Sequence, residues 1–149
     1  MATTIGTETR LADLLTDLIQ LDCDAAYAYR AAIDRIDNAA FRSALTAFRQ
    51  DHLRHADELG EHLSAIGKTP PTDGDIKSFL TQGKVMLGGL LGDKAVLQAM
   101  RSNEDDANAA YERAVRHRDV GPQLRAILQR AFDDERQHRD WIVEALAEL

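Results

Sequence analysis

The sequence predicts an all-α protein, a four-helix bundle made of two antiparallel helical hairpins. Three observations favour this fold. Apolar residues recur at alternating steps of three and four over four long segments. Helix-favouring residues such as Ala, Leu, Arg and Glu are abundant, and only 3 of the residues are prolines. With 149 residues the chain suits a single domain, which we expect to span positions 1–149.

The hydrophobic stripes place the four helices at about 8–36, 38–66, 93–118 and 122–148. Asn38 is a candidate N-cap for the second helix, Gly67 suits the C′ position after it, and Asp93 can cap the third helix. Short turns after the first and third helices make two hairpins. A crossover at about 67–92, irregular and partly helical, is expected to connect one end of the bundle to the other.

Ionisable residues interrupt every stripe near its midpoint. They are Asp22 on the first helix, His52 and His55 on the second, Glu104 on the third, and Glu135 and His138 on the fourth. Residues of a hairpin are level when they are equidistant from its turn. Asp22 and His52 both lie 15 residues from position 37, while Glu104 and Glu135 lie 16 and 15 residues from position 120. Because an α-helix rises about 1.5 Å per residue, the six side chains are predicted to form one layer in the core.

The two hairpins also resemble each other in sequence. Asp22-x-Asp24-Ala25-x-x-x-Tyr29 lines up with Glu104-x-Asp106-Ala107-x-x-x-Tyr111 at an offset of 82. His52-x-x-His55 lines up with Glu135-x-x-His138 at an offset of 83. An internal duplication explains the match, and shared bundle patterning is the alternative.

Ionisable groups in an apolar core must be paired, neutralised or bound to a metal. A divalent metal can take all six as ligands, since carboxylate and imidazole together suit iron, manganese and zinc. Alternatively, protonated histidines pair with the acids and form a polar layer without metal. Asp24 lies two residues off the first stripe and is expected to face sideways or outward, and Asp133 and Asp134 are expected to face water.

This pattern resembles the ferritin-like superfamily, and most closely small bacterial ferritin-like proteins of unassigned function. Those proteins carry a carboxylate on the first and third helices and Glu-x-x-His on the second and fourth. The resemblance implies iron as the metal, with manganese or zinc as alternatives, and Fe(II) oxidation or peroxide handling in a stress response. The resemblance also implies that Tyr29, seven residues after Asp22, supports the site. Tyr111 repeats this spacing after Glu104, and filling of the apolar core is the alternative role for both tyrosines. The ligands that the resemblance implies are Asp22, His52, His55, Glu104, Glu135 and His138.

Two residues depart from the superfamily pattern. Asp22 replaces a Glu and is one methylene shorter. His52 replaces the second-helix Glu, which bridges two metals in the resembling proteins. A neutral imidazole offers a single lone pair and cannot bridge in that way. The sequence therefore leaves open one metal, or two with unequal occupancy.

The composition excludes several partners. The net charge is 18 − 25 = −7 and no basic stripe occurs, so nucleic acid is not expected as a partner. No apolar run has the length of a membrane span, and positions 1–10 lack a signal-peptide core, so a cytoplasmic location is expected. Cys23 is the single cysteine, which excludes an internal disulfide and a Cys-x-x-Cys metal site.

Two functions follow from the sequence. The first is a metal-binding protein of the ferritin-like kind, in which no catalytic base or substrate pocket can be identified. The second is a metal-free scaffold or stress-associated interaction protein, which His52 and the apolar crossover favour. The apolar positions from Ile76 to Leu91 also predict a homodimer. Whether the protein is an enzyme stays open at this level.

Overall fold

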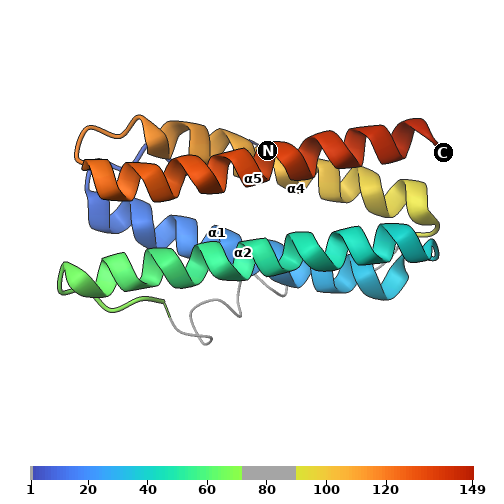
Figure 1. Cartoon of the computed structure of the whole chain (residues 1–149), viewed down its shortest axis with the longest axis horizontal. Helices are drawn as coiled ribbons and strands as arrows, with labels where there is room; N and C mark the ends of the chain where they lie inside the picture. Colours follow the sequence, from blue (N-terminus) through green and yellow to red (C-terminus); the bar gives the residue numbers. More distant parts are fainter. Residues whose placement is uncertain (1, 72–89) are drawn as a thin grey trace.

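A computed structural model of the chain describes residues 2–71 and 90–149, which form an all-α four-helix bundle (Figure 1). The prediction of the fold class is therefore confirmed. The helices have bounds within three residues of the expected ones: α1 (Leu11–Arg35), α2 (Ala39–Ala65), α4 (Asp93–Val115) and α5 (Pro122–Ala147).

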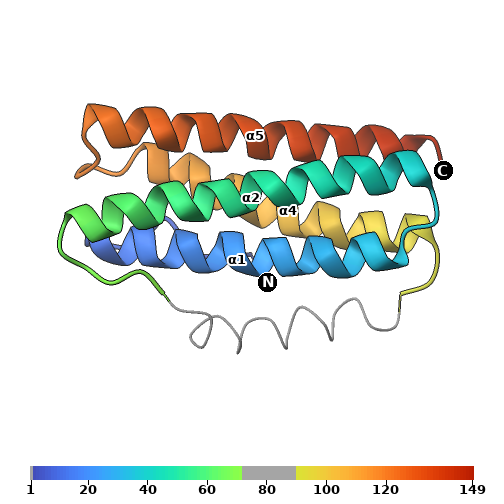
Figure 2. The same cartoon turned by 60° about the horizontal axis from the view of Figure 1, so that its bottom comes forward.

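The helices pair as two antiparallel hairpins, α1 with α2 and α4 with α5. The hairpins pack through α1 against α4 and through α2 against α5. The chain leaves α2 at one end of the bundle and enters α4 at the other (Figure 2). This makes every contacting pair of helices antiparallel, so residues near the middle of all four helices come to the same level. The predicted crossover falls mostly on residues 72–89, outside the described part of the chain.

Local signals set most helix ends. The Asn38 side chain accepts a hydrogen bond from Phe41 N at 3.0 Å, as expected for an N-cap. Gly67 has φ +81°, a left-handed conformation that glycine adopts without steric cost, and follows α2 at the predicted C′ position. The prediction for Asp93 is wrong. Asp93 is the first residue of α4, and its carboxylate accepts hydrogen bonds from the backbone of Asp37 and Asn38 at 2.7 and 3.1 Å.

The core divides into two apolar clusters with the ionisable layer between them. One cluster lies toward the α4–α5 turn and includes Leu18, Leu59 and Leu128. The other lies toward the α1–α2 turn and includes Leu45 and Met100. Burial of these side chains stabilises both halves of the bundle through the hydrophobic effect. None of the helices in residues 2–71 and 90–149 combines the length and the apolar character that a membrane span requires.

Replacing the N-cap of α2 tests the local control of the α1–α2 hairpin. Asn38→Ala is expected to lower the free energy of unfolding by about 1 kcal/mol, because Phe41 N loses its acceptor. Asn38→Asp keeps an acceptor at this position and serves as the control. Urea unfolding followed by circular dichroism measures both. Equal losses in the two variants would contradict the assigned cap.

Candidate metal centre

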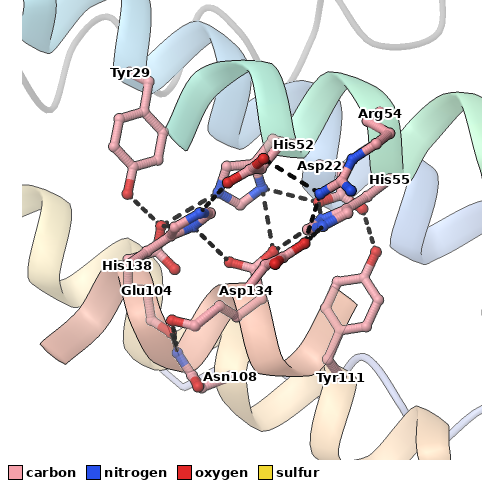
Figure 3. A network of polar contacts seen from close by, with 12 residues as sticks. Asp22, Tyr29, His52, Arg54, His55, Glu104, Asn108, Tyr111, Asp134 and His138 are labelled. Carbon is pink, nitrogen blue, oxygen red and sulfur yellow. Dashed lines mark hydrogen bonds and ion pairs between the residues drawn. The ribbon is translucent and has the colours of Figure 1, made fainter. Parts of the chain in front are cut away.

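The six predicted residues meet in the middle of the bundle, one or two from each helix. Figure 3 labels all of them except Glu135. All of them are buried, with exposed fractions of 0–2%. They form two overlapping groups of four, in which each residue brings one ligand atom to within 4.8 Å of the others. The Asp22 subsite consists of Asp22, His52, His55 and Glu135. The Glu104 subsite consists of His52, Glu104, Glu135 and His138.

The Asp22 subsite gathers two nitrogens and two oxygens from three helices. His52 Nδ1 lies 2.9 Å from Asp22 Oδ1 and 3.4 Å from Glu135 Oε1. His55 Nδ1 lies 3.4 Å from Asp22 Oδ1 and 3.2 Å from Glu135 Oε1. Four ligands about 2.1 Å from a tetrahedral cation lie about 3.4 Å apart. The spacing of these atoms is thus close to that of a metal coordination shell.

The Glu104 subsite uses the other ring nitrogen of His52 and the other oxygen of Glu135. His52 Nε2 lies 3.2 Å from Glu104 Oε1. His138 Nδ1 lies 3.4 Å from Glu104 Oε1 and 3.4 Å from Glu135 Oε2. The two subsites therefore share His52 and Glu135 but draw on different atoms of each.

Two aspartates at the edge of the layer orient the histidines. Asp134 Oδ2 lies 2.9 Å from His55 Nε2, and Asp51 Oδ2 lies 2.8 Å from His138 Nε2. Each of these outer aspartates, Asp51 and Asp134, thus holds a histidine of the opposite hairpin. A carboxylate on Nε2 favours the proton there and turns Nδ1 toward the interior, as is common for metal-binding histidines.

Arg54 connects the two outer aspartates on the α2/α5 side of the layer. Its Nη2 donates to Asp134 Oδ2 at 2.6 Å and to Asp51 Oδ1 at 3.2 Å. The guanidinium therefore offsets the negative charge that the two aspartates add next to the layer. Its own side chain is 40% exposed, so this stabilisation is screened by solvent.

Two buried tyrosines donate hydrogen bonds across the hairpins to the carboxylates of Glu104 and Asp22. The Tyr29 hydroxyl, from α1, donates to Glu104 Oε1 on α4. The Tyr111 hydroxyl, from α4, donates to Asp22 Oδ2 on α1. Both tyrosines therefore contact the layer, and the contacts are reciprocal in the same way as those of the outer aspartates.

Apolar and amide groups complete the surroundings. Phe48 stacks on the His138 ring with centroids 4.3 Å apart. Trp141 packs against Phe48 at 5.4 Å, so it lies behind Phe48. Asn108 Nδ2 donates to the backbone oxygens of Glu104 and Glu135 at 2.7 and 3.0 Å, which ties α4 to α5 beside the layer.

Several buried polar atoms at the centre make no hydrogen bond, although His55 Nδ1 and His138 Nδ1 lie 3.2–3.4 Å from carboxylate oxygens. They include His55 Nδ1, His138 Nδ1, Glu104 Oε2 and both carboxylate oxygens of Glu135. Buried polar atoms without partners are rare in folded proteins because each costs about 1–3 kcal/mol. Histidine nitrogens and carboxylate oxygens that converge without hydrogen bonds are the atoms that a bound cation would stabilise. The residues present therefore fit a divalent metal ion.

The comparison with protein families supplies one assignment. Residues 10–117 match the family described as Domain of unknown function (DUF2383). The chain belongs to this family. The matched region contains α1, α2 and α4, and with them Asp22, His52, His55 and Glu104. No curated protein and no solved structure was found to match the chain.

Mutual contacts shift the titration of the buried histidines in this DUF2383 protein. Burial alone would lower the pKa of His55, but its contacts with Asp22 and Glu135 outweigh burial and raise that pKa to about 10. Burial is likewise outweighed at His138, where Glu104 and Glu135 raise the pKa to about 9. Without metal, these histidines therefore carry positive charge at neutral pH.

The pKa values of His52 and of the three carboxyl groups in the layer are shifted as well. Burial opposes a charge on His52, but the negative charge of Glu135 and the contacts with Asp22 and Glu104 raise its pKa well above the usual value. Burial would raise the pKa of Asp22 and Glu104, yet their histidine partners hold both below the usual range. Burial dominates at Glu135, whose pKa is raised.

Sequence reasoning missed the outer aspartates. Asp134 was expected to face water, and this is wrong, since it contacts His55 and Arg54 and its side chain is only 22% exposed. Asp51 was not identified at all. A signal existed, because an aspartate directly precedes both His52-x-x-His55 and Glu135-x-x-His138. Asp24 lies outside both subsites, as expected for a residue off the stripe.

The raised histidine pKa values predict how the stability of the chelator-treated protein depends on pH. Imidazolium pairing of His55 with Asp22, Glu135 and Asp134, and of His138 with Glu104, Glu135 and Asp51, contributes fully below the unfolded-state pKa of about 6.5. The contribution is lost as the pH rises through about 9 and about 10. Urea unfolding in this window should show falling stability.

A variant isolates one histidine in this experiment. His55→Gln should give a flatter profile, since it removes one of the histidines whose titration causes the decline. A wild-type profile that is flat or rising across the same pH range would contradict the imidazolium assignment.

Proposed function

We propose that this DUF2383 protein is a ferritin-like metal protein that binds a divalent transition-metal ion, iron in particular, inside the bundle. The observation that supports this most directly is the set of inward-facing nitrogens and oxygens without hydrogen-bond partners. The proposed ligands are Asp22, His52, His55, Glu104, Glu135 and His138.

The donor set supports the choice of metal class. Each subsite offers two imidazoles and two carboxylates, a mixture that suits iron, manganese and zinc better than calcium or magnesium, which favour oxygen ligands alone. The outer aspartates support the same function, because they orient His55 and His138 with Nδ1 toward the centre.

The proposed activity is Fe(II) oxidation or peroxide reduction, for which bound iron would supply the redox chemistry. The protein residues would bind the ion and keep bulk water away. Tyr29 and Tyr111 hold Glu104 and Asp22 by their hydroxyl groups, and Phe48 covers His138 with an apolar ring. Reducing one peroxide molecule to water takes two electrons and two protons, so each turnover would oxidise two Fe(II) ions.

A second function has one observation in its favour. The histidines and acids of the layer pair well enough to raise the pKa of His55 to about 10, so the layer can persist as a polar network without metal. In that case the protein would be a scaffold or interaction protein. The homodimer stays a prediction, because most of the apolar segment behind it lies outside the described residues.

Metal analysis of protein purified without an affinity tag tests the proposed function. Wild type should carry stoichiometric iron, manganese or zinc, measured by mass spectrometry of the metal after dialysis. Glu135→Ala should lose most of it, because Glu135 belongs to both subsites. Glu144→Ala, an exposed position on the same helix, is the matched control. Equal sub-stoichiometric metal in all three would support the scaffold instead.

The outer aspartates can be tested separately from the ligands. Asp134→Asn removes the charge that holds His55 Nε2 and is expected to lower metal affinity by about 10- to 100-fold. Asp133→Asn changes the adjacent residue, whose carboxylate pairs with Gln129 and Arg136 on its own helix, and should leave affinity unchanged. Competition with a chromogenic chelator measures both. Similar affinities in the two variants would contradict the role of Asp134.

A further inference from the structure

His52 occupies the centre of the layer with its two nitrogens in different subsites. Nδ1 faces Asp22 Oδ1 at 2.9 Å, and Nε2 faces Glu104 Oε1 at 3.2 Å (Figure 3). The ring is 0% exposed, so water cannot take the place of either contact. The His52 side chain thus spans the distance between the carboxylates of Asp22 and Glu104.

Glu135 and His52 differ in how many metal ions each side chain can bind at once. The two oxygens of Glu135 point to different subsites, one toward His55 and one toward His138, so a carboxylate here can ligate two ions at once. A neutral imidazole has one lone pair and one N–H. Whichever nitrogen of His52 binds a metal, the other keeps its proton and donates it to the carboxylate of the other subsite.

This donation disfavours a second ion in two ways. The second subsite is left with three ligands instead of four. The carboxylate of that subsite, Asp22 or Glu104, already accepts a hydrogen bond from His52. Filling both subsites completely would require the neutral side chain to lose its single N–H proton and become an imidazolate anion.

We propose that His52 limits this protein to one tightly bound metal ion per chain, because binding at one subsite weakens binding at the other. The inference rests on the proposed function, since it concerns the same site. His52 acts as the ligand that determines nuclearity. Occupation of one subsite weakens binding at the other by about 100-fold, a coupling of the size seen between interacting sites.

Mn(II) provides a direct count and a spectroscopic signature. Wild-type protein under equilibrium dialysis should bind one Mn(II) per chain and give the electron paramagnetic resonance spectrum of an isolated ion. His52→Glu supplies the fourth carboxylate and a second pair of oxygens, so it should bind two ions whose spectrum shows spin coupling. His62→Glu, a histidine of α2 outside both subsites, is the control and should bind one.

The outcomes separate this inference from the proposed function. Two ions of similar affinity in wild type would overturn the inference and leave the proposed function standing. One ion in wild type and still one in folded His52→Glu would also overturn it, since His52 would not be the limiting residue. No Mn(II), iron or zinc in wild type would overturn the proposed function itself and this inference with it. If His52→Glu does not fold, the wild-type count and spectrum decide alone.

Discussion

Six ionisable side chains share the centre of this bundle, where no solvent reaches them to stabilise their charges. Burying a charge without a partner costs several kcal/mol, so every group in the layer needs an opposite charge, a hydrogen bond or a metal ion. This constraint accounts for the surrounding structure. The tyrosines, the outer aspartates and Arg54 all satisfy atoms of the layer or of its immediate neighbours.

At His55 and His138, the nitrogen that faces an outer aspartate is hydrogen-bonded and the nitrogen that faces the centre is not. Asp51 and Asp134 take the Nε2 atoms of His138 and His55, while the Nδ1 atoms of the same rings have no hydrogen-bond partner. Such a division is what a metal centre needs, because the ligands are held from behind while their lone pairs face a common point.

The contacts of the two hairpins are reciprocal. A tyrosine of each hairpin donates to a carboxylate of the other, and an aspartate of each holds a histidine of the other. This agrees with the internal similarity at offsets of 82 and 83 in the sequence. The reciprocity ends at the pair His52 and Glu135, where one hairpin has an imidazole and the other a carboxylate. In the proposed metal centre, this difference prevents the two subsites from being filled in the same way.

The sequence by itself determined the four helices, the level of the layer and its donor types. Helical period and distance from a turn depend on spacing along one chain segment, and both could be read directly. Tertiary structure decided which groups meet. Asp93 contacts the α1–α2 turn instead of its own helix, and Asp134 reaches His55 instead of water. The two nitrogens of His52 face opposite carboxylates because α1 packs against α4 and α2 against α5. Ring orientation and contacts between hairpins follow from this packing, and no spacing within a single helix encodes them.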